Sequence, residues 1–180
     1  FSFYKLLRSS DFGVPQARER VYIVGFRNDL NINSFKFPEP ILETKTVRDI
    51  LEENPPENTF IDRDDIVFNN HKKTIKNARK PHRIGTISKG GQGERVYSID
   101  ASGITLSAYG GGPGAKTGVY LVNDRVRKLT PREAARMQGF PETFILDEKT
   151  HKALKQFGDS VSVPVIKKIY DSILFSINSK

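Results

Sequence analysis

Apolar residues at the start of the chain form two short runs separated by turn-forming residues. The runs are FSFYKLL, from residue 1, and RVYIVGF, from residue 20, with DFGVPQ between them. Short apolar runs bounded by Gly, Pro and Asp are typical of β-strands. Because residues 21–26 are apolar almost throughout, we predict that this strand is buried on both faces of a larger sheet.

Between residues 84 and 122 short β-type runs recur, now separated by glycines. The runs RIGTI, ERVYSI, GITLSAY and GVYLV are divided by GGQG and GGGPG. This punctuation predicts a small, mostly β unit with exposed glycine loops.

Helical signals mark two further segments. TVRDILEE (46–53) predicts a short helix that is stopped by two prolines. A second helix is predicted to begin at Thr130, where Pro131 and Glu133 complete an N-terminal capping pattern, and to end at Gly139.

The last segment has apolar residues at helical spacing, so one face of the predicted helix must pack on another element. The sheet that contains residues 21–26 is the partner we expect. The chain would then leave one domain, build a second and return to the first. The apolar residues of this segment are Ile166, Ile169, Tyr170, Ile173, Leu174 and Ile177.

The charge distribution adds a candidate binding edge. The chain has 29 Lys and Arg against 21 Asp and Glu, a net charge of +8, which fits simple solubility as well as a polyanionic partner. Residues 43–65 are mostly acidic, whereas residues 69–93 contain only basic charges and lead into the glycine loops. We therefore interpret the basic stretch as an edge that contacts phosphates. Its cations are Lys72, Lys73, Lys76, Arg79, Lys80, Arg83 and Lys89.

Composition excludes several classes of site. The chain has no cysteine, which removes disulfides, thiolate zinc sites and thiol nucleophiles. His71, His82 and His151 lack the spacing of a metal site, so we expect no metal. No apolar run approaches the roughly 18 residues of a membrane span, and no signal peptide is visible, so we expect a cytoplasmic protein. Phe1 lies within an apolar run, as expected of a fold entered midway.

Three motifs follow one another at characteristic distances. They are PQARERVYIVGFR (15–27), RKLTPREAARMQGFP (127–141) and QFGDSVSVPV (156–165). Each alone has an ordinary interpretation: solvated charges at a strand edge, a basic helix against a neighbouring loop, and a common turn. In this order and spacing they resemble the QxRxR, RxLTxRExxRxQGFP and GNSV blocks of bacterial DNA cytosine-5 methyltransferases, in which a variable target-recognition region separates the first two.

The resemblance implies a fold. It indicates an α/β structure in which the edge portion of a Rossmann-like methyltransferase sheet carries an inserted, small, mostly-β target-recognition domain and a C-terminal helix that returns to the sheet. We accordingly divide the chain into late strands of the catalytic domain (1–45), the target-recognition domain (46–128), a hinge and helix (129–157) and the C-terminal helix packing on the catalytic domain (158–180).

The resemblance also implies partners. The family flips a cytosine out of duplex DNA and transfers a methyl group from S-adenosylmethionine to C5, with a cysteine nucleophile and a glutamate acid. The FxGxG, PCQ and ENV blocks that carry this chemistry are absent from the chain. We therefore expect an incomplete bacterial, nucleoid-associated enzyme, inactive alone, whose partners are double-stranded DNA and an N-terminal catalytic half. Asp159, Ser160 and Val161 would lie beside the cofactor, with Asp159 replacing the family's asparagine.

The QxRxR block implies roles at the flipped base. Arg20 would hold the cytosine O2, Arg18 would contact sugar and phosphate, and Gln16 would orient the closed catalytic loop. A guanidinium suits such contacts because it stays charged and presents a planar fork of donors. Since side chains alternate along a strand, we expect Arg18 and Arg20 to point the same way.

The two glycine-rich stretches, residues 89–98 and 105–112, resemble the recognition loops of a family member that methylates GCGC, which is the target we expect. Ordinary hairpin turns are the simpler interpretation of the glycines alone. Gln92 would pair with the orphaned guanine, and Arg95 would read guanine O6 and N7. Backbone close to the bases would come from Tyr109, Gly110 and Gly112, and phosphate contacts from Arg83, Lys89, Thr105 and Lys116.

Two functions remain open at this level. The first is a partial methyltransferase of a restriction-modification system that needs its catalytic half. The second is a stand-alone, sequence-specific double-stranded DNA-binding module without catalytic activity. Arg20 and its neighbours favour the first, because a pure binding module has no use for an arginine aimed at an extruded base. A generic RNA-binding domain is disfavoured because the strands lack aromatic stacking motifs.

Overall fold

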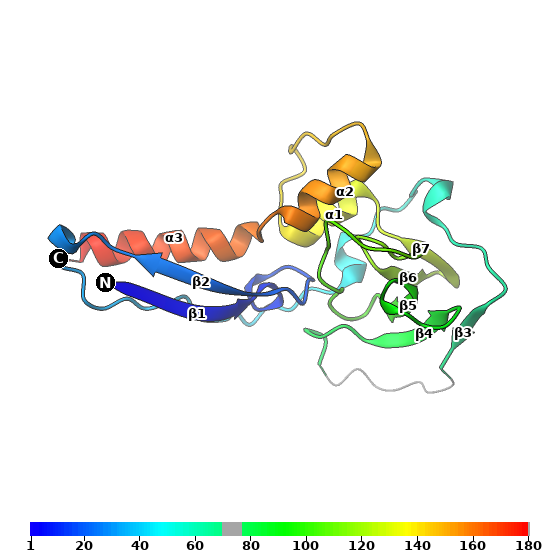
Figure 1. Ribbon diagram of the computed structural model, residues 1–180, viewed down its shortest axis with the longest axis horizontal. Helices are drawn as coiled ribbons and strands as arrows, with labels where there is room; N and C mark the ends of the chain where they lie inside the picture. Colours follow the sequence, from blue (N-terminus) through cyan, green and yellow to red (C-terminus); the bar gives the residue numbers. More distant parts are fainter. Residues whose placement is uncertain (70–76, 180) are drawn as a thin grey trace.

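The computed structural model describes residues 1–69 and 77–179, and it has an elongated shape with two parts (Figure 1). One part is an arm made of β1 (Ser2–Arg8), β2 (Glu19–Gly25) and α3 (Val163–Asn178). The other part is built on a five-stranded sheet with α1 (Pro131–Gln138) and α2 (Thr150–Asp159) beside it. Of the cations in the predicted basic edge, Lys72, Lys73 and Lys76 lie outside the described residues, as does His71.

The arm confirms that the last helix returns to the first strands. β1 and β2 pair antiparallel, with Phe3 opposite Val24. The strand face that carries these two residues packs against α3, chiefly against Val165 and Ile169. Alternation along the strands therefore gives the arm a hydrophobic core. The buried residues of this core are Leu7, Phe12, Val24, Phe26, Ile32, Phe37, Val165 and Ile169.

Burial of β2 on both faces, predicted from its apolar sequence, is wrong for the described residues. Tyr4 is 80 % exposed and Ile23 is 74 % exposed, and the two are cross-strand neighbours with Leu6 and Val21 beside them. The reason is that α3 covers one face of the hairpin only. We call the uncovered residues Tyr4, Leu6, Val21 and Ile23 the open hairpin face.

The apolar side of α3 is also wider than the hairpin that it covers. Val165 and Ile169 are buried, but Ile166, Tyr170 and Leu174 on the adjoining side are exposed. The apolar side of α3, predicted as a single packing face, therefore consists of two adjacent faces. The β1–β2 hairpin covers only one of them. The apolar character of the helix exceeds what this chain alone buries.

The five-stranded sheet has the order β3-β4-β5-β6-β7, in which β5 and β6 are parallel and the other neighbours are antiparallel. This is the mostly-β unit expected between residues 84 and 122, extended by a strand at each side. The strands are β3 (Ile66–Phe68), β4 (Arg83–Ile87), β5 (Arg95–Ser98), β6 (Val119–Val122) and β7 (Arg125–Lys128).

The run GITLSAY, predicted as a strand, is irregular. Among the described residues it makes no backbone ladder with the sheet strands; Gly103 donates to Pro15 O and accepts from Ala17 N, and Ile104 N donates to the hydroxyl of Tyr120 in β6. Leu106 N donates to the Gln16 side chain. The run therefore lies between the sheet and the arm, where it joins the two.

The segment TVRDILEE forms a single 3₁₀ turn, Val47–Ile50, and not the predicted helix. Leu51 is extended, and the backbone N–H of Glu52 donates to the carboxylate of Glu133 at 2.8 Å. This tertiary hydrogen bond takes the donor that another helical turn would have used.

Local signals predicted α1 correctly. The Thr130 hydroxyl accepts from the Glu133 N–H, the Glu133 carboxylate accepts from the Thr130 N–H, and Gly139 ends the helix with φ of 81°. The helix α2 was not predicted, and Gly158, expected in a turn, lies within its last turn. None of the helices in the described ranges is long and apolar enough to cross a membrane.

Candidate functional site

The two predicted glycine loops meet in space. The N–H of Gly114 donates to Gly93 O at 2.7 Å, and a Cβ added at Gly93 would lie 2.0 Å from Gly111 O. Only glycine permits this close approach. Both loops line one cleft of about 330 Å³, to which the predicted residues Gln92, Thr105, Tyr109, Gly110 and Lys116 contribute.

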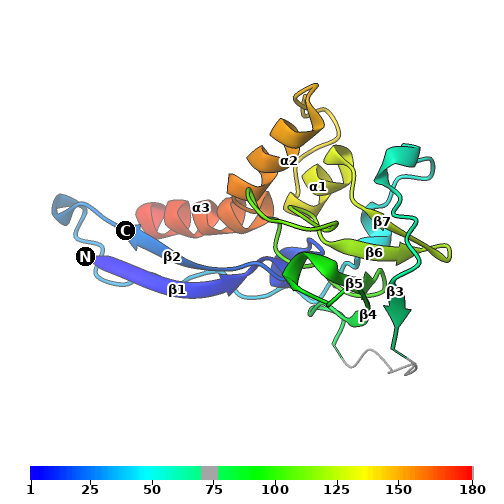
Figure 2. The ribbon, with the colours of Figure 1, turned by 45° about the vertical axis from the view of Figure 1, so that its right-hand side comes forward.

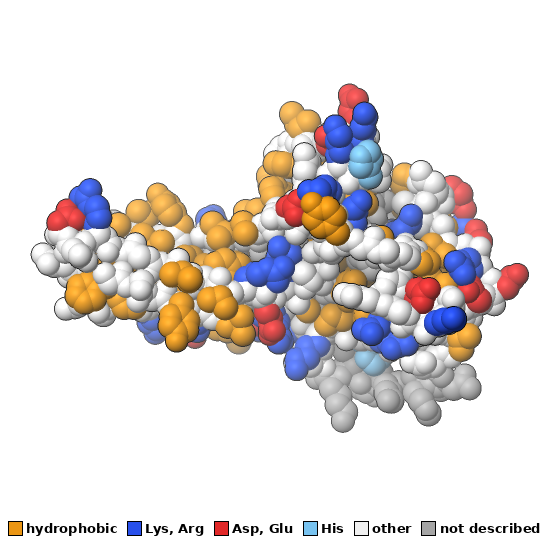
Figure 3. Space-filling model, in the orientation of Figure 1, with side chains coloured by type: hydrophobic (Ala, Val, Ile, Leu, Met, Phe, Trp, Pro, Cys, Tyr) orange, Lys and Arg blue, Asp and Glu red, His pale blue; other side chains and the backbone are white. Residues whose placement is uncertain are grey.

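Three predicted cations lie in or next to the first glycine loop and the strands that flank it. Arg95 is the first residue of β5 and is exposed, as are Arg83 at the start of β4 and Lys89 in the first loop. Figure 3 shows several Lys and Arg side chains over β4 and β5. The predicted guanine reader and two predicted phosphate contacts are therefore all exposed, and the Arg83 guanidinium lies close to Gly90 of the first glycine loop.

The second glycine loop is exposed to solvent and contains a residue with a positive φ angle. Gly112 has φ of 80°, a value that side chains disfavour. Tyr109 is 73 % exposed, and its ring lies 4.9 Å from Lys155 Nζ in α2. The connection between β5 and β6, which carries this loop, runs beside α2 (Figure 2). The loop thus presents an aromatic ring and bare backbone where the sheet meets the arm.

Arg20 is exposed at the start of β2. Its Nη1 donates to Glu19 O at 2.7 Å, while the Glu19 carboxylate pairs with Arg8. Among the described residues no carboxylate lies within ion-pair distance of Arg20. Its guanidinium keeps donors available for a ligand.

Arg18 lies elsewhere than expected. It directly precedes β2, and its carbonyl accepts from Ser9 N at 2.9 Å; Arg18 is buried, whereas Arg20 is exposed. Its residue is 5 % exposed. Nη1 donates to Leu106 O at 3.2 Å, and Nη2 donates to Gly158 O at 3.3 Å and to Ser160 O at 2.9 Å. Arg20 and Tyr22 both act electrostatically on Arg18, as residues on one side of a strand do, but the burial and carbonyl contacts of Arg18 leave it unavailable to a sugar or phosphate in this conformation.

The positive charge of Arg18 lies in an electrostatically unfavourable environment. Burial lowers the pKa of its guanidinium, and the positive charge of Arg20 lowers that pKa further. Three carbonyl oxygens accept from it in compensation. An arginine retains its proton under such conditions because its ordinary pKa lies far above neutral pH.

Gln16 is fully buried at the same junction. Its Oε1 accepts from Leu106 N, and its Nε2 donates to Met137 O and to Gln138 Oε1 at 3.0 Å. Gln138 in turn donates to Phe157 O at 2.7 Å. Gln16 therefore joins the segment around Leu106 to α1 and α2 through a buried amide network.

The predicted cofactor-side residues border an open, apolar hollow of about 640 Å³. Asp159, Ser160 and Val161 line it together with Phe140, Ile166 and Tyr170. The Asp159 carboxylate accepts from Lys155 Nζ at 2.7 Å. The carboxylate that replaces the family's amide is thus paired within its own helix.

Sequence reasoning missed Lys155, which contacts both Tyr109 and Asp159. The signal that was available is the spacing of four residues between Lys155 and Asp159, which pairs charges on a helix surface. It also missed the buried ion pair between Arg127 and Glu133, which crosses from β7 to α1.

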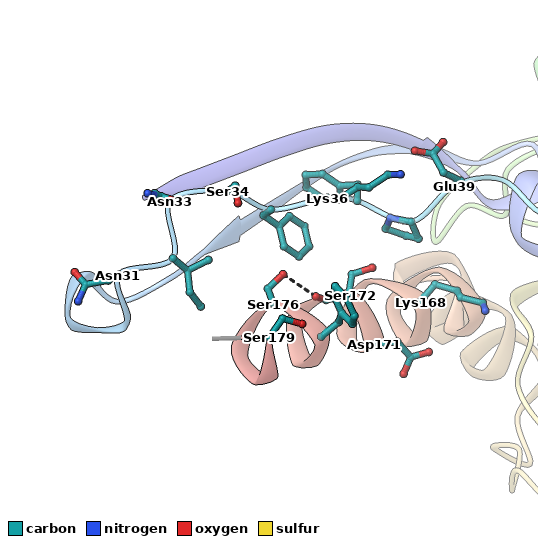
Figure 4. A pocket seen from close by; sticks show the side chains of 15 residues that line it. Asn31, Asn33, Ser34, Lys36, Glu39, Lys168, Asp171, Ser172, Ser176 and Ser179 are labelled. Carbon is teal, nitrogen blue, oxygen red and sulfur yellow. Dashed lines mark hydrogen bonds between the residues drawn. The ribbon is translucent and has the colours of Figure 1, made fainter.

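A larger cavity, of about 770 Å³, lies between α3 and residues 31–39 (Figure 4). Its polar lining includes Lys36, Glu39, Lys168 and Asp171, and it includes none of the predicted site residues. No group of three or more acidic, His or Cys side chains that could hold a metal ion occurs in the part of the chain that the structure describes.

Comparison with known proteins agrees with this placement of motifs. The family model described as C-5 cytosine-specific DNA methylase matches residues 1–174. The Type II methyltransferase M.HhaI of Haemophilus parahaemolyticus is 47 % identical over 182 residues, covering 100 % of this chain and 55 % of that protein. The Type II methyltransferase M.SsoII of Shigella sonnei is 38 % identical, covering 98 % of this chain and 45 % of that protein.

Solved structures show the same fold. The Entamoeba histolytica methyltransferase EhMeth superposes with a TM-score of 0.68 at 17 % identity, over 98 % of this chain and 54 % of that one. The S. pombe Dnmt2 methyltransferase superposes with a TM-score of 0.64 at 18 % identity, over 99 % of this chain and 57 % of that one. The chain spans about half the length of the curated relatives that it matches. With almost all of its residues matched by the family model, the chain belongs to the C-5 cytosine-specific DNA methylases.

Proposed function

We propose that this chain is the DNA-recognising part of a site-specific DNA (cytosine-5)-methyltransferase of a restriction-modification system. Joined to its catalytic half, it acts on a flipped cytosine within GCGC. The convergence of both glycine loops on one cleft, to which Gln92, Thr105, Tyr109 and Lys116 contribute, carries this proposal. The 47 % identity to M.HhaI over the whole chain supports the same assignment.

The chemistry divides between two parts of the enzyme. Methylation at C5 needs a nucleophile at C6 and an acid at N3, and the base must leave the helix stack to be reached. This chain has no cysteine, so the nucleophile comes from the catalytic half. Arg20 holds the extruded cytosine through O2, Gln92 fills the gap and pairs with the orphaned guanine, and Arg95 reads guanine in the major groove.

The hollow beside Asp159 fits one side of S-adenosylmethionine. Its walls of Phe140, Val161 and Ile166 suit an apolar adenosyl surface, and the carboxylate of Asp159 lies at its border. S-adenosylmethionine supplies the methyl group when it is bound. The residues of this chain contribute one wall, and the catalytic half contributes the rest of the binding site.

The uncovered apolar surfaces support a partner half. The open hairpin face and the exposed residues Ile166, Tyr170 and Leu174 of α3 are large apolar side chains in contact with water. Contiguous apolar surface of this kind marks an interaction site in soluble proteins. We propose that the catalytic half covers both, which completes the burial that the sequence of β2 predicts.

Reconstitution tests the function. We expect a chimera that joins the N-terminal part of M.HhaI to this chain to transfer a labelled methyl group from S-adenosylmethionine to a duplex containing GCGC. This chain alone should transfer none. Changing the nucleophilic cysteine of the chimera to serine should abolish transfer and leave duplex binding intact.

The same experiment separates the competing function. A folded chimera without methyl transfer, together with full site-specific binding by this chain alone, would establish a stand-alone DNA-binding module. Methyl transfer to duplexes that lack GCGC would support the proposed methyltransferase activity but contradict GCGC as its target sequence.

Arg95 is expected to determine specificity at one guanine. Arg95→Ala should reduce discrimination at that base pair by about 1–3 kcal/mol, because a bidentate contact to O6 and N7 is lost. Binding should be measured with duplexes that carry single base-pair changes, at several salt concentrations. The control, Lys89→Ala, should weaken binding to all duplexes alike and reduce the salt slope by about 0.9. If Arg95→Ala weakened binding to all duplexes alike and Lys89→Ala reduced discrimination at one guanine, Arg95 would be the phosphate contact and Lys89 the base contact.

A further inference from the structure

We infer that Arg18 is a positioning residue that fixes the recognition segment Thr105–Ala108 on the turn formed by Gly158, Asp159 and Ser160. It thereby couples the loop that reads DNA to the cofactor side of the site. This inference rests on the proposed function for its consequence, but the junction itself is a property of the free chain. It gives Arg18 a role inside the protein in place of the sugar and phosphate contact expected from the motif.

The guanidinium spans both elements at once. Nη1 donates to Leu106 O in the recognition segment, and Nη2 donates to Gly158 O and Ser160 O at the end of α2. A planar fork can serve carbonyls in two directions, whereas an ammonium group is a single point of charge. Because Arg18 is 5 % exposed, these hydrogen bonds are shielded from water.

The two backbones that Arg18 joins are in direct contact. A Cβ added at Gly158 would lie 2.1 Å from Ala108 N and 2.2 Å from Ser107 C. No intervening side chain separates the recognition segment from the last turn of α2. A displacement of one segment must therefore move the other or break the contact.

A second tie lies on the surface. Lys155 Nζ is 4.9 Å from the centre of the Tyr109 ring and 2.7 Å from Asp159 Oδ2. Both partners are solvent-exposed, so water and salt screen this contact. Arg18, in the interior, is the stronger of the two ties.

The junction lies between two functional surfaces. The recognition segment continues into Tyr109 and the glycine loop that borders the DNA cleft. The turn continues into Val161 and the apolar hollow. Seating of the loop on a cognate duplex should therefore order the turn, and Arg18 is the side chain through which the two are held in register.

Hydrogen exchange of the free chain tests the junction. In Arg18→Lys, the amides of residues 104–109 and of residues 158–162 should both exchange at least about tenfold faster, because both lose a shared hydrogen-bonding partner. Arg79→Lys is the matched control: Arg79 donates to Ile41 O, Leu42 O, Thr44 Oγ1 and Asp11 Oδ1, so only the regions around residues 11 and 41–44 should respond. Acceleration confined to one of the two segments would refute the coupling.

A second variant separates this role from a general contribution to folding. Gly158→Ala disturbs the same contact without removing the guanidinium and should accelerate the same two segments. If both variants instead loosen β4 and β5 to the same extent, Arg18 is a general fold residue and the inference fails.

Exchange in the presence of a GCGC duplex supplies a readout that a merely structural role would not change. In the unaltered chain the duplex should protect both residues 105–112 and residues 158–162. In Arg18→Lys it should still protect the first segment but no longer the second. Protection of both segments in the variant would overturn the inference. Absence of protection in the unaltered chain would count against the proposed function and leave the free-chain result to decide the role of Arg18.

Discussion

Replacing Glu133 with alanine is expected to lower the free energy of unfolding by about 3–5 kcal/mol, because it leaves Arg127 as an uncompensated buried charge. The two side chains are 1 % and 0 % exposed. Glu133 accepts from both terminal nitrogens of Arg127, at 2.7 and 2.8 Å, and from the backbone N–H groups of Glu52 and Thr130. One carboxylate thus fastens β7, the cap of α1 and the end of the 46–52 segment.

Urea unfolding of the variants measures this effect. The matched control is Glu142→Ala, since Glu142 also pairs with an arginine, Arg136, but is 62 % exposed. Its loss should cost about 1 kcal/mol or less. A double replacement, Arg127→Met with Glu133→Leu, should recover part of the loss by removing both charges. Equal destabilisation by the two single glutamate replacements would contradict the buried-pair account.

Arg20→Ala is expected to lower turnover of the reconstituted chimera on the order of 10²-fold, the effect of removing one donor from the reacting base. Duplex binding should fall much less, because this arginine engages the base only after it has left the stack. The exposed guanidinium has one hydrogen bond in the described residues, to the neighbouring Glu19 O. Single-turnover rates and equilibrium binding should be measured on the same duplex.

Two further variants make this result specific. Arg27→Ala removes another exposed arginine close to β2, one already paired with Asp29 at 2.7 Å, and should leave turnover near that of the unaltered chimera. Arg20→Lys keeps the charge without the planar fork and should recover only part of the rate. Parallel losses of binding and turnover in Arg20→Ala would instead make Arg20 a phosphate contact.

Sequence predicted best where the determining groups are neighbours along the chain. The start and end of α1 depend on Thr130, Pro131, Glu133 and Gly139, which act within one or two turns of the helix. The two β-strands at the start of the chain were likewise predicted from apolar runs bounded by turn-forming residues. In these places local chemistry and tertiary structure agree.

Prediction failed where tertiary partners decide the outcome. GITLSAY has the composition of a strand, yet Gln16 and Pro15 take its hydrogen bonds. Arg18 and Arg20 are two residues apart in one motif, yet only Arg18 is buried, because the carbonyls that enclose it come from residues about 90 and 140 positions away. The periodicity of apolar residues in a sequence does not indicate which distant residues will form such hydrogen bonds. The candidate DNA-recognition residues were therefore proposed from their motifs, whereas their burial required the fold.

The contact between Gly93 and Gly114 bears on how target specificity diverges among such enzymes. Since one loop's carbonyl is fastened to the other loop's amide, with no room for a side chain at Gly93, neither loop has a conformation independent of its partner. Recombination that exchanged a single loop between relatives would bring together two backbones that had not been selected to fit. New specificities are thus expected to be inherited as matched loop pairs, and grafting experiments should transplant both loops together.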